Sequence, residues 1–253
     1  MTAVATNTDV VLAVRDVHMA FGGLVVFDHL NFELHRGERH AIIGPNGAGK
    51  TTFVSLVTGL LKPLSGDILF NGEAITRLTP QQRVKAGIAR TFQINTLFRG
   101  LNPLESVMLA LCQRDGRAGQ PLRSVSHEKP QIEEAHAILA RFGLQNAALS
   151  QTDNLPYGQQ RLLEVALALA LKPQVLLLDE PAAGLSTQQG HELFAQLVDL
   201  TRGTTILFIE HDMNLVFRYA EKVSVFAAGS MVVQDTPDNV RNHPRVREVY
   251  LGV

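Results

Sequence analysis

Residues 44–51 read Gly44-Pro45-Asn46-Gly47-Ala48-Gly49-Lys50-Thr51 and match the pattern GxxxxGK[ST]. The apolar run HAIIG before it predicts a short buried strand, and KTTFVSLVTG at 50–59 has helical spacing that stops at Gly59. A glycine-rich loop in this position can turn its N–H groups inward beside the positive end of the helix dipole. A chance match is expected in on the order of one chain in a hundred of this length. The stretch therefore predicts a phosphate-binding P-loop.

The P-loop also assigns roles to individual side chains. We expect the Lys50 ammonium to reach the β and γ phosphates of a nucleotide and the Thr51 hydroxyl to ligate Mg²⁺. The candidate nucleotide-binding residues of this stretch are Gly44, Pro45, Asn46, Gly47, Ala48, Gly49, Lys50, Thr51 and Thr52.

A second apolar run ends in two acids. Val175 to Leu178 predict a buried parallel strand, and Asp179 and Glu180 follow at its carboxyl end, where α/β sheets bind ligands. Solvated strand-end acids are common, so alone this pattern is as compatible with a purely structural role. Beside a P-loop it predicts that Asp179 acts on Mg²⁺ and that Glu180 orients the attacking water or accepts its proton.

The order of predicted elements indicates an α/β fold. The start is β-rich over 10–21 and 24–34, and DILFNG at 67–72 reads as a strand and turn. Helix-like segments at 103–112 and 131–142, with an exposed loop between them, predict a helical lobe within the α/β body. The rest alternates as βα units do, which implies a mostly parallel sheet. These later elements are helix 158–171, strand 174–178, helix 188–200, strand 204–209, helix 212–219 and strand 222–227.

Length and composition limit the choice further. The chain has 253 residues, room for one domain over 1–253 with a smaller lobe at about 93–172. The formal charge of −1 gives no basic footprint for nucleic acid. The single Cys112 cannot form an internal disulfide, and the opening residues do not resemble a secretory signal, so a cytoplasmic site is favoured. No apolar stretch approaches the roughly 18–20 residues of a membrane span, so any membrane role needs another chain.

Residues between the two motifs carry a specific resemblance. The run Leu155-Pro156-Tyr157-Gly158-Gln159-Gln160-Arg161 resembles the signature motif of ABC ATPases, usually written LSGGQ. The family's other motifs follow in order: Phe21 as the A-loop, Gln93 of RTFQ as the Q-loop, GLS at 184–186 as the D-loop, and His211 of IEHDM as the switch histidine. The resemblance implies a P-loop NTPase ABC cassette with a mostly parallel core sheet, an N-terminal antiparallel β part and an inserted α-helical lobe.

The resemblance also implies roles for these residues. Phe21 would stack on adenine, a contact worth about 1–3 kcal/mol. His211 would contact the γ-phosphate, and Gln93 would reach Mg²⁺ and the attacking water. Taken singly, each is more often an ordinary core or surface residue, and only their order favours function. The implied catalytic residues are Glu180, His211, Gln93 and Lys50, and the implied metal ligands are Thr51, Gln93 and Asp179.

The signature implies that one chain is insufficient. Tyr157, Gly158 and Gln159 begin a helix whose N-terminal N–H groups suit a phosphate, and in this family they bind the nucleotide held by the opposite subunit. Two cassettes, as a homodimer or heterodimer, would close on ATP and open after hydrolysis. Pro156 replaces the usual serine and Ser186 an Asp or Asn, and both lie on the surface offered to the partner. We expect an active ATPase with ATP and Mg²⁺ as cofactors, and the sequence leaves open whether Pro156 and Ser186 slow hydrolysis.

Further details resemble the ATP-binding subunits of branched-chain amino acid importers. These are FGGL at 21–24, LF at 97–98, YGQQR, DEPAAGL, IEHDM and the ending TPDNVRNHPRVREVYLG. The resemblance implies membrane permeases, a second cassette, an external solute-binding protein and a peripheral position on the cytoplasmic face of the membrane. Hydrophobic amino acids are the implied cargo, with urea, short amides or other amino acids left open because cargo never touches this chain.

Two functions of other classes compete. A nucleic-acid-associated ABC ATPase would typically carry a tandem cassette or coiled-coil insertion and a basic face, which this sequence lacks. A regulatory cassette would bind ATP without hydrolysing it. Pro156 favours this interpretation and Glu180 opposes it.

Overall fold

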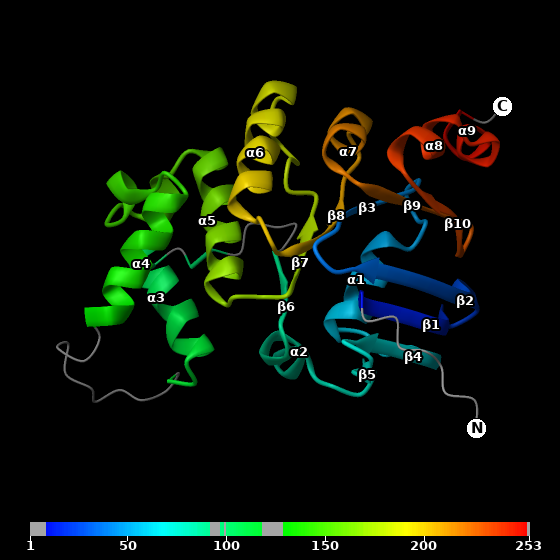
Figure 1. Ribbon diagram of the computed structural model, residues 1–253, viewed down its shortest axis with the longest axis horizontal. Coiled ribbons are helices and arrows are strands. Elements are labelled where there is room, and N and C mark those ends of the chain that lie inside the picture. Colours follow the sequence, from blue (N-terminus) through cyan, green and yellow to red (C-terminus); the bar gives the residue numbers. More distant parts are fainter. Residues whose placement is uncertain (1–8, 92–96, 99, 118–128, 252–253) are drawn as a thin grey trace.

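The computed structural model describes residues 9–91, 97–98, 100–117 and 129–251. Its arrangement, shown in Figure 1, places the helices around α3 (Pro103–Arg114) and α4 (Lys129–Arg141) at one end and the β-rich part at the other. Gln93, predicted as both a catalytic residue and a metal ligand, lies outside the described residues.

The N-terminal part forms a four-stranded sheet in the order β2-β1-β4-β5 with antiparallel pairing throughout. A two-residue turn at Gly22 and Gly23 joins the first two strands, and Gly22 has φ 58°, which suits glycine. The antiparallel β part is therefore confirmed. Its strands are β1 (Val10–Phe21), β2 (Leu24–His35), β4 (Ser65–Phe70) and β5 (Glu73–Ala74).

The second sheet has six strands in the order β10-β9-β3-β8-β7-β6. All of its pairs are parallel except the edge pair of β10 and β9, so the mostly parallel sheet is also confirmed. Its strands are β3 (Arg39–Ile43), β6 (Ile88–Arg90), β7 (Val175–Asp179), β8 (Thr205–Ile209), β9 (Lys222–Ala227) and β10 (Ser230–Asp235).

The helices that the sequence predicted are present with ends shifted by no more than two residues. Besides α3 and α4 they are α1 (Lys50–Thr58), α5 (Tyr157–Ala170), α6 (Thr187–Leu200) and α7 (Met213–Tyr219). Three short helices were not predicted, namely α2 (Pro80–Ala86), α8 (Pro237–Asn242) and α9 (Pro244–Leu251). Two 3₁₀ turns at Gln145–Ala147 and Thr152–Asn154 connect α4 to α5.

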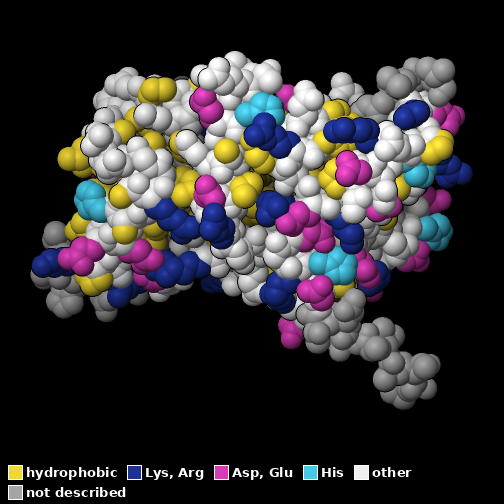
Figure 2. Space-filling model, turned by 45° about the horizontal axis from the view of Figure 1, so that its top comes forward, with side chains coloured by type: hydrophobic (Ala, Val, Ile, Leu, Met, Phe, Trp, Pro, Cys, Tyr) yellow, Lys and Arg dark blue, Asp and Glu magenta, His cyan; other side chains and the backbone are white. Residues whose placement is uncertain are grey.

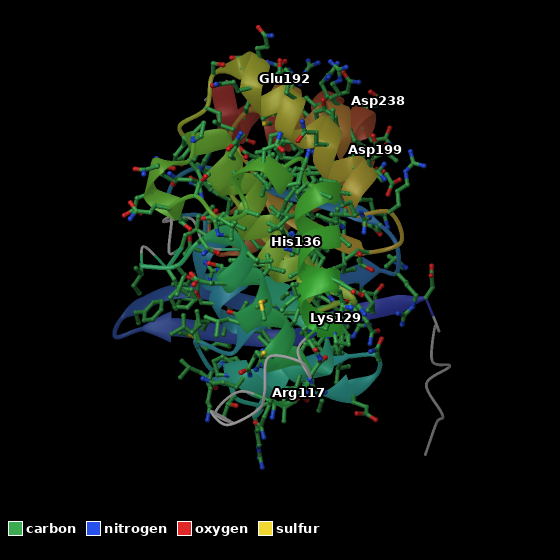
Figure 3. The ribbon with its side chains drawn as sticks, turned by 90° about the vertical axis from the view of Figure 1, so that its left-hand side faces the viewer. Arg117, Lys129, His136, Glu192, Asp199 and Asp238 are labelled. Atoms are coloured by element: carbon green, nitrogen blue, oxygen red, sulfur yellow. The ribbon has the colours of Figure 1, made fainter. Side chains whose placement is uncertain are left out.

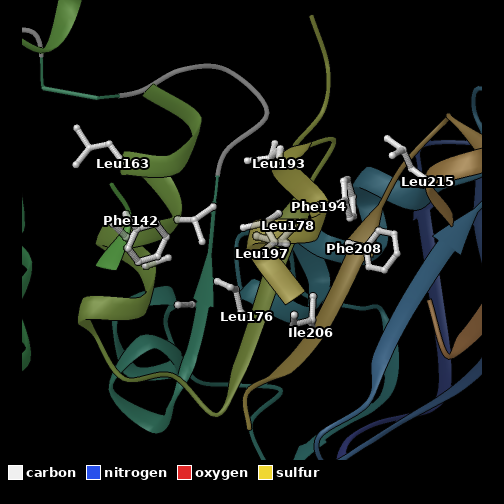
Figure 4. Packing of buried hydrophobic residues seen from close by; sticks show 14 of the residues in the cluster. Phe142, Leu163, Leu176, Leu178, Leu193, Phe194, Leu197, Ile206, Phe208 and Leu215 are labelled. Atoms are coloured by element: carbon white, nitrogen blue, oxygen red, sulfur yellow. The ribbon is translucent and has the colours of Figure 1, made fainter. Parts of the chain in front are cut away.

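Alternate residues of the parallel strands enter two separate cores. In β7, Val175 and Leu177 join the core shared with α1 and the antiparallel sheet, whereas Leu176 and Leu178 face α5 and α6. Figure 4 shows the second core, where Phe194 of α6 packs on Phe208 of β8 with ring centroids 5.3 Å apart. A sheet covered on both faces explains why its central strands are continuous apolar runs, and it leaves the strand ends to carry polar side chains.

The helices α3, α4 and α5 are joined by a charged contact as well as by apolar packing. Arg114 of α3 donates to both oxygens of Glu134 on α4 at 2.8 and 2.9 Å, and to the carbonyl of Ala170 on α5 at 3.2 Å. The hydrogen bonds from Arg114 lower the pKa of Glu134 to about 2. Figure 3 looks onto this end, with Lys129 and His136 on the outer side of α4. The extent of a separate lobe over 93–172 stays a prediction.

Charged side chains of both signs share the face of the molecule that Figure 2 shows. Figure 2 shows one face, on which Lys and Arg side chains are interspersed with Asp and Glu. Across the described ranges, none of the helices combines the length and the apolar character needed to span a membrane.

Candidate active site

The P-loop joins the end of β3 to the start of α1. Its turn is closed by the Ala48 N–H, which donates to the Pro45 carbonyl at 3.2 Å, and α1 begins directly at Lys50. The Lys50 side chain is buried, and its Nζ donates to the carbonyls of Gly44 at 2.6 Å and Pro45 at 3.0 Å. The loop therefore folds around its own lysine, as a phosphate cradle requires.

Two glycines of this loop are required by close neighbours. A Cβ on Gly44 would lie 2.3 Å from the Phe226 carbonyl oxygen, and one on Gly49 would lie 2.7 Å from the Phe27 ring. Gly49 also has φ 92°, in the left-handed region. Packing inside the chain thus explains Gly44 and Gly49, whereas a Cβ on Gly47 would meet nothing within 4 Å. A glycine-rich loop at the start of a helix, with a lysine inside it, fits a nucleotide phosphate.

The two acids at the carboxyl end of β7 lie beside this loop. Burial lowers the pKa of Lys50, and the negative charges of Glu180 and Asp179 act in the opposite direction. Asp179 is buried, and its Oδ2 accepts a hydrogen bond of 2.7 Å from Nη2 of Arg90 in the neighbouring strand β6. The Thr51 hydroxyl and the Asp179 carboxylate are the kinds of oxygen donor that Mg²⁺ prefers.

Glu180 and His211 meet across the ends of β7 and β8. The imidazole Nε2 of His211 donates to Glu180 Oε1 at 2.7 Å, although 31 residues separate them. Glu180 has φ 48°, which is uncommon for a residue with a side chain and is found mainly where the surroundings enforce it. The structure thus brings together the predicted catalytic acid and the predicted switch histidine.

A buried acid, Glu210, holds the backbone of His211 and of the segment that follows Glu180. Its carboxylate accepts hydrogen bonds from the N–H of Ala182 at 2.8 Å and of His211 at 3.2 Å. Burial raises the pKa of Glu210, and the charge of Glu180 adds to this effect. A cavity of about 210 Å³ opens at this point. It is lined by Glu180, Ala182, Ala183, Leu185, Ser186, Thr187, Gly190, Glu210, His211, Asp212 and Leu215.

The signature residues lie at the start of α5, where Pro156 is the N-terminal cap. The Tyr157 hydroxyl donates to the Ala183 carbonyl at 2.9 Å, and a Cβ on Gly158 would meet open space. Ser186, another departure from the family pattern, caps α6 by accepting from the Gln189 N–H at 3.3 Å. Pro156 and Ser186 therefore both occupy helix caps of this chain.

The remaining predicted residues lie where a ligand can reach them. Phe21 is at the end of β1 and 48% exposed. Pro45, Asn46, Gly47 and Thr51 are also exposed. Thr52 is half-buried in the first turn of α1.

Sequence reasoning missed three polar residues of this region: Arg90, Arg161 and Glu210. Arg90 and Glu210 are charged residues at the ends of buried strands, the same signal that identified Asp179. Arg161 sits within the signature run and is buried. Its partners Tyr157 and Glu164 lie four residues before it and three residues after it, and this helical spacing is the signal that could have found them.

Comparison with known proteins defines the class. The family model for the ABC transporter matches residues 27–183. The chain therefore belongs to the ABC transporter family, as one of its ATP-binding cassettes, and this class hydrolyses ATP to power transport.

Within the family, the chain is similar to ATP-binding proteins of branched-chain amino acid transport. It is 39% identical to LivG of Escherichia coli (strain K12), over 95% of this chain and 97% of LivG. It is 34% identical to BraF of Pseudomonas aeruginosa, over 96% of this chain and 98% of BraF.

Solved structures agree. An ATP-binding cassette of an ABC transporter in its ADP conformation has a TM-score of 0.84 and 27% identity, covering 96% of this chain and 99% of that one. A nucleotide-free ATP-binding cassette has a TM-score of 0.83 and 26% identity, covering 96% and 100%. The predicted fold class is confirmed by both.

Proposed function

We propose that this chain powers the import of branched-chain or other hydrophobic amino acids by hydrolysing ATP. The observation that carries the hydrolytic role is the contact of Glu180 with His211 beside the P-loop. A carboxylate held by an imidazole at the mouth of a phosphate cradle is placed to orient a water molecule. The cargo rests on the relatives, whose names place them in branched-chain amino acid transport.

Different residues of the chain bind ATP, hold Mg²⁺ and act on the attacking water. The N–H groups of the P-loop and Lys50 bind the phosphates, and Phe21 stacks on adenine. Thr51 and Asp179, with Gln93, would hold Mg²⁺, which neutralises phosphate charge. Glu180 orients the attacking water and accepts its proton, and His211 holds Glu180 and contacts the γ-phosphate.

A second cassette completes the site. In this proposal Tyr157, Gly158 and Gln159 face the nucleotide of the partner cassette, and the partner's signature faces the nucleotide held by Lys50. The cassette pair works on membrane permeases at the cytoplasmic face, and an external solute-binding protein delivers the cargo. Regulatory and nucleic-acid-associated roles are not favoured, because the hydrolytic residues are present and the relatives are transport proteins.

ATP turnover by the purified chain with Mg²⁺ tests this proposal, with Lys50→Ala as the comparison. We expect turnover that rises more than linearly with protein concentration and falls about 10²- to 10³-fold in Lys50→Ala, because a donor to the transferred phosphate is lost. Turnover equal in the two proteins would contradict the proposed site. Turnover seen only after the permeases or a sister cassette are added would identify a heteromeric assembly.

A further inference from the structure

The segment 181–186, which follows the catalytic acid, is held from two sides. Directly after β8, Glu210 accepts a hydrogen bond from the Ala182 N–H at 2.8 Å. From α5, the Tyr157 hydroxyl donates to the Ala183 carbonyl at 2.9 Å, although the two residues are 26 positions apart. The Tyr157 ring also lies against Gly184, whose φ is 81°. A hydrogen bond and a ring contact therefore tie this segment to the start of α5.

The Tyr157 hydroxyl is itself oriented by a charged neighbour. Arg161, one turn further along α5, donates to the phenol oxygen at 2.5 Å and lies over the ring at 5.0 Å from its centroid. Glu164 accepts from Arg161 at 2.8 Å, and the two side chains are only 5% and 8% exposed. Because the phenol oxygen accepts from a cation, its own proton is directed away, toward the Ala183 carbonyl.

The position of Tyr157 gives this contact a meaning beyond packing. Tyr157 is 39% exposed and belongs to the signature run, which by the proposed function faces the nucleotide of the partner cassette. Glu180, three residues before Ala183, acts on the nucleotide of its own chain. The hydrogen bond thus runs between the parts of one chain that serve two different nucleotides.

We propose that Tyr157 is a positioning residue that couples the two ATP sites of the cassette pair, by tying the signature end of α5 to the segment behind Glu180. This inference rests on the proposed function. When the start of α5 contacts the nucleotide of the partner cassette, the hydrogen bond from Tyr157 fixes the position of Ala183. Because Ala183 lies three residues after Glu180, the backbone that carries Glu180 is then held in place as well. Removing the hydroxyl leaves each site built and loosens their connection.

The test compares Tyr157→Phe with Tyr219→Phe in the full chain. Tyr219 of α7 makes a matched hydrogen bond, in which its hydroxyl donates to the carbonyl of His191 in α6 at 3.0 Å. In hydrogen exchange without nucleotide, we expect amides of 182–187 to exchange about two- to tenfold faster in Tyr157→Phe alone, the amount one hydrogen bond provides. Unchanged exchange would overturn the tie and leave Tyr157 as a direct contact to the partner's nucleotide only.

A second readout addresses coupling. In ATP turnover, Tyr157→Phe should lower kcat and bring the Hill coefficient toward one, while the affinity of the single chain for nucleotide stays that of the parent. Cooperativity equal to that of Tyr219→Phe would overturn the coupling. If the parent itself shows no turnover with any partner, the proposed function fails, whereas the tie is still judged by the exchange of 182–187.

Discussion

The P-loop and the signature segment differ in whether neighbours within the same chain require their glycines. In the P-loop, Gly44 and Gly49 are demanded by Phe226 and Phe27 of the same chain, and Lys50 is satisfied by the carbonyls of its own loop. In the signature segment, a side chain on Gly158 would meet nothing within 4 Å. The two glycines of the first region are required by neighbours in the same chain, whereas no neighbour in this chain requires the glycine at position 158. The proposed function assigns the open space at Gly158 to the nucleotide of a partner cassette.

The largest effect on ATP turnover should come from substitution of Glu180. We expect Glu180→Gln to lower ATP turnover about 10²- to 10⁴-fold, since general-base catalysis is worth that much. Nucleotide binding should persist because the P-loop is untouched. Turnover and equilibrium binding of ATP measure the two effects, and chromatography reports whether an ATP-bound dimer accumulates. Equal turnover in parent and variant would show that Glu180 is not the catalytic acid and would favour the regulatory role.

Alanine at one glycine of each region separates them directly. Gly44→Ala should destabilise the fold by about 1–3 kcal/mol or more and abolish nucleotide binding, because the added methyl overlaps the Phe226 carbonyl. Gly158→Ala should leave thermal unfolding of the single chain unchanged and reduce turnover of the assembled pair. Loss of stability in Gly158→Ala, or none in Gly44→Ala, would break the comparison.

The smallest effect concerns the strand that enters the P-loop. His40 in β3 is fully buried, with Nδ1 2.5 Å from Glu38 and Nε2 2.8 Å from the Ser224 hydroxyl. Burial lowers the pKa of His40. The unfolded chain then binds more protons below its pKa of about 6.5, so this residue's contribution to stability is present above that pH and is lost as the pH falls.

We therefore expect His40→Asn to flatten the fall in unfolding free energy between about pH 7.5 and 5.5. His136→Asn, at an exposed site on α4, is the matched control and should keep the parent's slope. The parent's slope also contains His29, whose pKa is raised by a hydrogen bond with Asp16 and which acts in the opposite direction. Identical slopes in the two variants would remove His40 from the account, and denaturant titration at each pH decides.

Much of the site was local in sequence and so could be predicted from it. The P-loop lies within eight consecutive residues, and the strand before Asp179 is an uninterrupted apolar run, so pattern alone located both. The helix α2 was missed although its signal is equally local. Thr79 and Gln82 form a capping box around Pro80 at the first helical position.

Contacts between residues far apart in the chain have no local signature in the sequence. The sequence by itself determined the order of the main elements, the P-loop and the paired acids, because strand and helix periods and glycine loops are encoded within a few residues. Only the tertiary structure decided which distant groups meet. His211 holds Glu180, and Arg90 holds Asp179 89 residues away. The physical reason is that parallel strands bring their carboxyl ends to one edge whatever chain length lies between them, and contacts at that edge depend on packing rather than on spacing.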